Sequence, residues 1–502
     1  MDRRKNLDIV RARAKPWDVV VIGGGATGSG CALDAASRGL KVLLLEGHDF
    51  GKGTSSRSTK LVHGGVRYLA QGNISLVREA LEERAVLLRN APHAVAAQEF
   101  AVPCYGAFDK VKYATGLKLY DLLAGEYPIG RSRILSRAET LDRLPGLDAT
   151  GITGGILYHD GRFDDTRLLI GILSTADSRG AVVLNYAKVG RISKNSAGRI
   201  DGVEFVDTLS GEEFIAPALT VINATGAFCD PVRRLADSKA NSIVTFSQGV
   251  HVVLDRGLMP SETALMIPKT SDGRVLFAIP WHGRLLVGTT DTPVPTAEME
   301  PRALDAEIDF ILETAGAYLA TKPTRDDVLS VFAGVRPLVK PARSFKNTAK
   351  LSRGHTIEID DSGLITVTGG KWTTYRRMAE DAVDQAVDLG GLSAGPCRTR
   401  ELAVENSAAS ETGGSSAIHP LLPYTLADVA RAVRSELAAT LEDVLARRTR
   451  CLFIDAKAAV EAADPVAEAI GEMLGEGEEW KKRQLAEFRR LARSYLTGDP
   501  AF

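Results

Sequence analysis

The sequence predicts an α/β fold in three parts: a parallel nucleotide-binding sheet, an antiparallel β-rich second domain and a C-terminal all-helical domain. Three patterns support this prediction. A strand, a glycine-rich turn, a helix and a second strand follow one another within residues 17–46. Short apolar runs separated by turn residues fill 242–288, and a charged segment with helical periodicity spans 422–495. Period-2 and period-3.6 patterns of this kind distinguish strands from helices.

The N-terminal unit has the spacing of a Rossmann-like dinucleotide site. A largely β-branched run, 17–23, leads into Gly23-x-Gly25-x-x-Gly28 and then a helix of small residues that ends near Gly39. The first glycine allows the tight turn, the second lets a pyrophosphate approach the backbone, and the third permits close helix–strand packing. Glu46 ends the next strand, where an acidic side chain accepts a hydrogen bond from a ribose hydroxyl.

Composition excludes several other classes of protein. The chain has 502 residues and a formal net charge of −1, so it can hold two or three domains but has no basic patch for nucleic acid. Its five cysteines are scattered without a Cys-x-x-Cys pair, which indicates a reducing compartment. No His or Cys cluster predicts a metal site. We expect neither an export signal nor a membrane span.

The predicted nucleotide domain is discontinuous in the sequence. Apolar strands at 218–224 and 364–368 are expected to extend the first parallel sheet, whereas the runs at 242–254, 264–268, 275–280 and 284–288 predict the antiparallel sheet. The predicted division is 1–91, 151–235 and 331–390 for the nucleotide domain, 92–150 and 236–330 for the second domain, and 391–502 for a linker and the helical domain.

An ordered set of motifs then indicates a family. The motifs are 58–69 (STKLVHGGVRYL), 221–226 (VINATG), 287–291 (VGTTD), 334–338 (GVRPL), 369–376 (GGKWTTYR) and 440–450 (TLEDVLARRTR). Over almost its whole length the chain resembles aerobic, FAD-dependent glycerol-3-phosphate dehydrogenases. The resemblance implies an FAD domain of the glutathione-reductase/D-amino-acid-oxidase type and FAD held without a covalent bond. It also implies oxidation of sn-glycerol 3-phosphate to dihydroxyacetone phosphate, with electrons passed to a membrane quinone.

The expected cofactor contacts combine the glycine turn with the matching motifs. Hydroxyls in 54–60 suit a diphosphate and ribityl chain, although a solvated polar loop has the same composition. The start of the helix predicted at 373–388, capped by Thr373 or Thr374, is expected to point N–H groups at the flavin pyrimidine ring. The full predicted set is Gly23, Gly25, Ala26, Thr27, Gly28, Glu46, Thr54, Ser55, Ser58, Lys60, Leu61, Val189, Ala224, Thr225, Gly226, Gly370, Lys371, Thr373 and Thr374.

The substrate's phosphate requires cationic side chains, because guanidinium and ammonium groups bind phosphate monoesters well. Surface ion pairs are the ordinary alternative for such residues. The matching motifs and the segment after them supply the predicted substrate ligands Arg67, Tyr68, Arg336, Arg353 and Lys371.

Oxidation of the alcohol also requires a base. His251 is the preferred candidate and His63 its rival, because imidazole titrates near neutral pH. A lone histidine in an apolar strand is also commonly structural. Arg336 and Lys371 complete the predicted catalytic set.

The remaining prediction is that segment 108–123 contacts the membrane. Lys110, Lys112 and Lys118 alternate there with apolar side chains, as in helices that lie on anionic lipid. A helix packed on its own domain explains the same residues. With the resemblance, we expect a cytoplasmic protein held peripherally on the inner face of the cell membrane; a homodimer is left open. The rival functions are glycerol-3-phosphate oxidase using dioxygen, an amine or amino-acid oxidase of the same fold, and a non-enzymatic FAD-binding scaffold.

Overall fold

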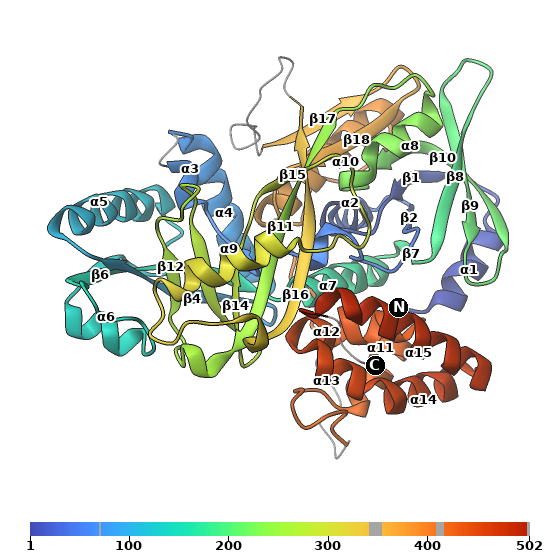
Figure 1. Ribbon diagram of the computed structural model, residues 1–502. Coiled ribbons are helices and arrows are strands. Elements are labelled where there is room, and N and C mark those ends of the chain that lie inside the picture. The colour runs from blue at the N-terminus through green and yellow to red at the C-terminus, as the bar shows by residue number, and fades with distance from the viewer. Residues whose placement is uncertain (70–71, 341–353, 408–415, 499–502) are drawn as a thin grey trace.

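The computed structural model describes residues 1–69, 72–340, 354–407 and 416–498. Its three parts are seen in Figure 1: a sheet that contains β1 and β10, a second sheet built around β11 and β16, and the C-terminal helices that lie below both. The two sheets are formed by interleaved segments of the chain, so neither corresponds to one continuous stretch of sequence.

The first sheet is parallel at its centre, as predicted. β1 pairs with β2 on one side and with β10 on the other, and β18 pairs with β10, all in parallel. The three valines of β1 are completely buried, as expected for a central strand. In spatial order the strands are β17 (His355–Ile359), β18 (Leu364–Gly369), β10 (Glu213–Asn223), β1 (Trp17–Ile22), β2 (Val42–Leu45) and β7 (Val182–Leu184).

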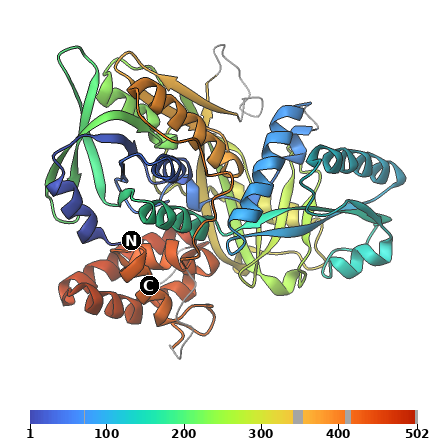
Figure 2. The same cartoon turned by 180° about the vertical axis from the view of Figure 1, so that it is seen from behind.

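Different layers cover the two faces of this sheet. The helical face carries α2 (Ala26–Ser37), α7 (Asp165–Ser178) and α10 (Tyr375–Gly390), which lie together in the view from behind (Figure 2). The other face carries the antiparallel extension β8 (Ala187–Lys194), β9 (Ile200–Asp207) and β10, together with α1 (Arg3–Ala12) and α8 (Cys229–Ala236). The result is a three-layer nucleotide-binding domain.

The second sheet is largely antiparallel, and the four strand predictions between 242 and 288 are confirmed. Its strands are β3 (Leu61–Val62), β4 (Val95–Cys104), β5 (Arg133–Leu135), β6 (Gly154–Phe163), β11 (Val244–Asp255), β12 (Ala264–Ile267), β13 (Leu276–Trp281), β14 (Arg284–Gly288), β15 (Thr292–Val294) and β16 (Val328–Val339). Its helices are α3 (Val66–Leu69), α4 (Ile74–Asn90), α5 (Ala107–Ala124), α6 (Arg137–Arg143) and α9 (Asp305–Gly316).

Two predicted domain boundaries differ from the structure. The segment from 151 was expected in the nucleotide domain, yet β6 pairs with β4 along its whole length. The segment from 331 was expected there too, yet β16 pairs with β11 across the second sheet. β6 leads directly into α7 of the nucleotide domain, and the predicted boundary at 331 falls inside the apolar run of β16.

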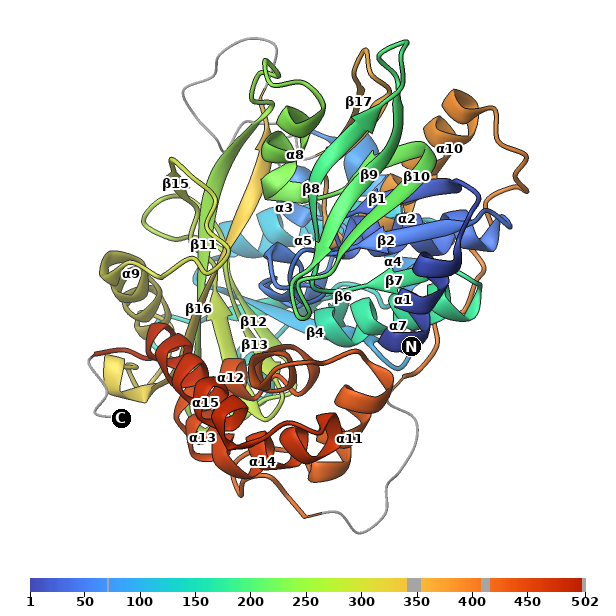
Figure 3. The ribbon, with the colours of Figure 1, turned by 90° about the vertical axis from the view of Figure 1, so that its right-hand side faces the viewer.

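The C-terminal helical domain, defined here as residues 416–498, packs against the second sheet. Phe332 of β16 and Trp281 of β13 share a buried cluster with Phe453 and Phe488 of the helices. Figure 3 shows these helices beneath β16 and close to α7. Their bounds are α11 (Leu426–Ser435), α12 (Cys451–Ile454), α13 (Ala456–Glu461), α14 (Ala463–Leu474) and α15 (Glu478–Ala492), with a π-helical turn at Asp443–Arg448.

Short 3₁₀ turns lie at Thr54–Ser56, Gly226–Phe228, Arg256–Leu258, Arg325–Asp327, Trp372–Thr374 and Arg493–Tyr495. Among the helices of the four described ranges, none is both long enough and apolar enough to cross a bilayer.

Candidate active site

A cavity of about 840 Å³ lies between the two sheets. Parallel strands bring their carboxyl ends to one edge of a sheet, where ligands of α/β proteins bind. The residues that follow β1, β2, β10 and β18 accordingly all line the cavity: Gly23, Glu46, Ala224 and Gly370. Because the lining continues onto β11 and β16 of the second sheet, the same cavity joins a nucleotide cradle to a second set of polar side chains.

The start of α2 forms the cradle. A β-carbon at Gly28 would collide with the carbonyl oxygen of Gly23, so a side chain there would push the helix off the strand. Glu46 accepts a hydrogen bond from the Gly24 N–H at 2.7 Å and another from the His48 N–H at 2.8 Å. Burial raises the pKa of the Glu46 carboxyl, and these two bonds oppose that rise. The geometry fits an anionic diphosphate at a helix N-terminus with an acidic group beside a ribose.

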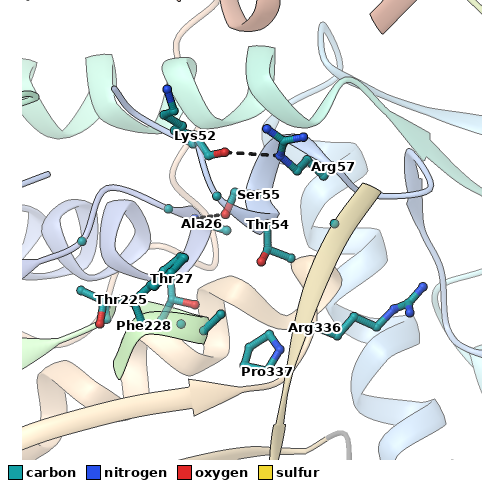
Figure 4. A pocket seen from close by; sticks show the side chains of 18 of the residues that line it. Ala26, Thr27, Lys52, Thr54, Ser55, Arg57, Thr225, Phe228, Arg336 and Pro337 are labelled. Carbon is teal, nitrogen blue, oxygen red and sulfur yellow. Dashed lines mark hydrogen bonds between the residues drawn. The ribbon is translucent and has the colours of Figure 1, made fainter. Parts of the chain in front are cut away.

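Most of the predicted cofactor residues lie around this cavity. Its lining includes Gly23, Gly25, Ala26, Thr27, Glu46, Thr54, Ser55, Ser58, Leu61, Val189, Ala224, Thr225, Gly226, Gly370, Lys371 and Thr373. Figure 4 shows Thr27, Thr54, Ser55 and Thr225 facing the same space. Three predicted residues are not part of the lining: Gly28, Lys60 and Thr374. Gly28 has the packing role described above.

Lys60 is directed away from the cavity. Its Nζ donates to Asp165 Oδ2 at 2.6 Å and to the Ser56 carbonyl at 2.8 Å, and its side chain is only 1% exposed. The rings of Trp281, Phe332 and Phe453 surround the ammonium group. Burial lowers the pKa of Lys60 to about 7, with Asp165 opposing the change. The expectation of a cofactor contact from Lys60 is therefore corrected to a buried ion pair.

Arg336 extends into the cavity from β16. Its guanidinium donates to Thr289 Oγ1 at 3.1 Å and to the carbonyls of Thr290 at 3.2 Å and Gln248 at 3.3 Å. Asp291 Oδ1 lies 3.4 Å from the same group. A β-carbon at Gly249 would occupy the place of this guanidinium, which explains a glycine in the middle of β11. Figure 4 shows Arg336 projecting from β16 on the side opposite Thr54 and Phe228. The guanidinium is thus held in one orientation.

His251 lines the cavity from β11 and is only 2% exposed. Its ring stacks on Phe332, with centroids 4.9 Å apart, and its Nε2 lies 2.9 Å from Thr59 Oγ1. Burial, with the charges of Lys60 and Arg336, holds the pKa of His251 well below its usual 6.5. A histidine in this state is neutral at physiological pH, and the lowered pKa also makes it a weaker base than a free imidazole.

His63 and Lys371 reach the cavity from the other side. The His63 N–H donates to Thr373 Oγ1 at 3.1 Å, which ties the His63 segment to the turn before α10. Lys371 lies directly before that turn. Thr374 occupies the N-cap position of α10, as predicted, and its hydroxyl donates to the Lys371 carbonyl instead of accepting from the first turn of the helix. Both candidate bases therefore border one cavity with Arg336 and Lys371.

Three predicted substrate ligands lie wholly or partly outside the described structure. Arg67 and Tyr68 belong to α3, but their side chains are not among the described ones. Arg353 falls outside the described residues. Within the ranges that the structure describes, no group of three or more His, Cys, Asp or Glu residues is arranged to hold a metal ion.

Sequence reasoning missed part of the lining. Residues 47–57 border the cavity at His48, Lys52 and Arg57, and Thr59 contacts His251. A run of glycines and hydroxyl residues from 51 to 59 was the available signal. Other unpredicted lining residues include Lys188, Gly190, Phe228, Pro231, Val232, Leu235 and Met299, which lie outside the quoted motifs.

Comparison with known families gives two matches. Residues 18–376 match the family of FAD-dependent oxidoreductases, and residues 398–484 match the C-terminal domain of alpha-glycerophosphate oxidase. Together they cover the cavity, both sheets and most of the C-terminal helical domain.

Individual relatives agree with these matches. The chain is 40% identical to the mitochondrial glycerol-3-phosphate dehydrogenase of Mesocricetus auratus, over 93% of this chain and 72% of the relative. It is 38% identical to a mitochondrial glycerol-3-phosphate dehydrogenase of Arabidopsis thaliana, over 97% of this chain and 87% of the relative. Among solved structures, the glycerol-3-phosphate dehydrogenase of Bacillus halodurans complexed with FAD superposes with a TM-score of 0.78 at 30% identity, covering 100% of this chain and 99% of that one.

Proposed function

This chain is a member of the FAD-dependent glycerol-3-phosphate dehydrogenase family, and on that premise we propose that it oxidises sn-glycerol 3-phosphate to dihydroxyacetone phosphate. One observation carries the proposal: a single cavity joins the glycine cradle to Arg336, His251 and Lys371. When bound, FAD supplies the acceptor for the hydride of the alcohol carbon. The chain's own residues bind the phosphate, orient the alcohol and take its proton.

Arg336 and Lys371 are assigned to the phosphate. Hydrogen bonds from Arg336 to Thr289 Oγ1 and two backbone carbonyls fix the plane of its guanidinium before substrate arrives, so little ordering is left for the binding step. The Asp291 carboxylate beside it orients the guanidinium further. Lys371 precedes α10 and adds a second cation at the same cavity. Arg67, Tyr68 and Arg353 remain proposed ligands on the family resemblance.

His251 is assigned as the base, with His63 as the alternative. The Nδ1 of His251 is buried, whereas Nε2 lies 2.9 Å from the hydroxyl of Thr59, another residue of the cavity lining, so we assign Nε2 as the proton acceptor. Thr59 Oγ1 contacts Nε2 and fixes the ring orientation. Removal of the hydroxyl proton at Nε2 leaves the alkoxide from which hydride transfer is easiest.

We expect anaerobic addition of sn-glycerol 3-phosphate to bleach the flavin absorbance, and equal concentrations of glycerol or glycine to leave it unchanged. The reason is that only the phosphate ester uses the two cations at the cavity. Stopped-flow absorbance of the yellow holoprotein measures the outcome. Bleaching by glycine would indicate an amino-acid oxidase, and no bleaching by any donor would leave only an FAD-binding scaffold.

The same reduced protein distinguishes the electron acceptors. We propose a membrane quinone as acceptor, so a soluble quinone analogue should restore the yellow colour rapidly with little peroxide. Rapid, stoichiometric peroxide formation in air would instead identify an oxidase.

The outer face of α5 supports a site at the membrane. Phe108, Val111, Leu119 and Leu122 are exposed and recur at helical intervals on the face opposite the buried Leu117. Phe108 is 79% and Leu122 75% exposed. Lys112 and Lys118 are exposed at the margins of this stripe, whereas Lys110 is bound to the Thr153 carbonyl at 2.6 Å. In Figure 1, α5 lies at the end of the molecule farthest from α14 and α15.

The two alternatives for segment 108–123 were a helix on anionic lipid and a helix packed on its own domain. The two faces of α5 fit one alternative each. Leu117, Tyr120 and Ala124 pack inward, while the apolar stripe faces solvent with lysines beside it. Such a helix suits the headgroup boundary of anionic lipid. We therefore propose peripheral attachment through α5 on the inner, cytoplasmic face of the cell membrane, where a quinone is accessible.

Replacing Phe108 and Leu122 together by serine should weaken binding to vesicles that contain phosphatidylglycerol by at least about 10-fold, because each buried side chain of this size contributes about 1.5–3 kcal/mol. Co-sedimentation measures the bound fraction. The matched control is Ile215→Ser with Leu219→Ser, a pair of exposed apolar residues on β10 of the other sheet. If both double variants lose vesicle binding equally, or if neither loses it, α5 is not the membrane contact.

A further inference from the structure

One segment that lines the cavity is held from behind by the C-terminal helical domain. This segment, residues 46–57, is called here the FAD loop. Its inner side borders the cavity at Glu46, Gly47, His48, Gly51, Lys52, Gly53, Thr54, Ser55 and Arg57. Its outer side faces the π-helical turn Asp443–Arg448 and the residues around it.

Asp49 is the centre of this contact. Its carboxylate is completely buried and accepts from Arg447 Nε at 2.6 Å and from both terminal nitrogens of Arg448 at 2.8 Å. These two arginines hold the pKa of Asp49 well below its ordinary value, against the effect of burial. Asn185 donates to the same carboxylate at 3.1 Å. A charge so deeply buried is stable only while its partners stay in place.

Further contacts follow along the loop. Lys52 Nζ binds the Glu442 carboxylate at 2.8 and 2.9 Å. The Ser56 carbonyl accepts from Arg450 at 2.8 Å, and Arg57 donates to the Tyr495 hydroxyl at 2.9 Å. Every one of these partners lies in the C-terminal helical domain, so the loop is fixed on its outer side at several points by one domain.

We propose that the C-terminal helical domain acts as a clamp on the FAD loop, with Arg448 as its principal positioning residue for cofactor binding. Loop segments without partners are mobile, and a loop that must be ordered on binding lowers affinity. Arg448 supplies two of the hydrogen bonds that stabilise the buried Asp49 carboxylate, so loss of that side chain is expected to loosen the loop at the cavity. The proposal rests on the FAD site alone and stands whatever the substrate proves to be.

Arg448→Met should weaken FAD binding by about 10-fold or more, since it removes two charge-assisted hydrogen bonds. Titration of apoprotein with FAD, followed by flavin fluorescence at a temperature where each variant is folded, measures the dissociation constant. Arg448→Lys keeps the positive charge but cannot form the bidentate contact. Its dissociation constant for FAD should lie between those of the wild type and Arg448→Met. Turnover of Arg448→Met should return toward the wild-type value when free FAD is raised to saturation.

The matched control is Arg167→Met. Arg167 of α7 forms an equally short pair with Glu436, at 2.7 and 2.8 Å, and so joins the same helical domain to the nucleotide domain without touching the FAD loop. The variant Arg167→Met should have a lower melting temperature than the wild type but the same affinity for FAD. A wild-type FAD dissociation constant for Arg448→Met, or equal losses of affinity in both variants, would overturn the clamp.

A milder variant keeps the test decisive if Arg448→Met does not fold. Tyr495→Phe removes the hydroxyl that accepts from Arg57 at 2.9 Å and donates to Glu300 at 3.3 Å. Loss of one such bond should weaken FAD binding about 3-fold, and unchanged affinity together with wild-type FAD binding by Arg448→Lys would refute the proposal.

Discussion

His251→Asn is expected to lower kcat for glycerol 3-phosphate by about 100- to 10,000-fold, the usual contribution of a general base. Asparagine is smaller than histidine and its amide reaches only the position of Nδ1, so it removes the contact to Thr59 together with the base while it keeps a polar group in the strand. Single-turnover flavin bleaching isolates the reductive step from reoxidation. The variant must retain wild-type FAD content for the result to report on the base.

The pH profile supplies the control for this assignment. Because burial and nearby cations lower the pKa of His251, its neutral form persists as the pH falls through 6.5. The reductive rate of the wild type should therefore stay flat across that range and decline only at lower pH. His63→Asn should keep this profile and most of the rate. If His63→Asn shows the large loss and His251→Asn does not, the base is His63.

Arg336→Ala is expected to reduce kcat/KM about 10- to 100-fold, because a charged hydrogen bond is worth about 1.5–3 kcal/mol and each 1.36 kcal/mol corresponds to a factor of ten. Arg336→Lys should lower kcat/KM less than Arg336→Ala does, because lysine restores the positive charge but not the bidentate hydrogen bonds of a guanidinium. Steady-state turnover of glycerol 3-phosphate with a soluble acceptor measures both.

Arg274→Ala is the matched control for Arg336. Arg274 approaches the same Asp291 at 3.8 Å but does not line the cavity. It should leave kcat/KM within about 2-fold of the wild type, as expected for a substitution outside the site. Normal turnover by a folded, FAD-bound Arg336→Ala protein would remove Arg336 from the substrate site.

The fold was largely predictable because its signals are local. The β-branched run before Gly23, the small residues of α2 and the apolar strands at 218–224 and 364–368 identify the parallel sheet, and the pairing confirms it. The domain boundaries were less predictable. β6 and β16 carry the apolar pattern of any strand, and only their partners decide which sheet they join.

The candidate site was predictable where a motif fixes the backbone. The turn at Gly23, the end of β10 and the turn at Gly370 place their residues at the cavity by chain geometry alone. Lys60 shows where this reasoning fails. It follows a run of hydroxyl residues that faces the cavity, yet its direction is set by Asp165, which is 105 positions away in the sequence. A contact between residues so far apart in the sequence cannot be predicted from the pattern of a short segment.

The C-terminal contacts were hidden for the same reason. Helical periodicity predicts α11 to α15 but says nothing of the surface on which they pack. Arg447 and Arg448 are both 3% exposed or less and contact Asp49. Arginine pairs in a segment of helical period are usually solvated, so burial of this kind is found only from the structure.

The interleaved chain also imposes an order on biosynthesis. Cavity residues are drawn from positions near 23, 46, 189, 225, 336 and 371, and the arginines that secure the FAD loop lie beyond 440. A ribosome adds residues one at a time from the N-terminus, so the glycine turn emerges long before its counterparts. If the C-terminal helical domain is the clamp proposed above, a nascent chain retains the flavin only after Arg448 has been added, and a product released earlier carries an open half-site.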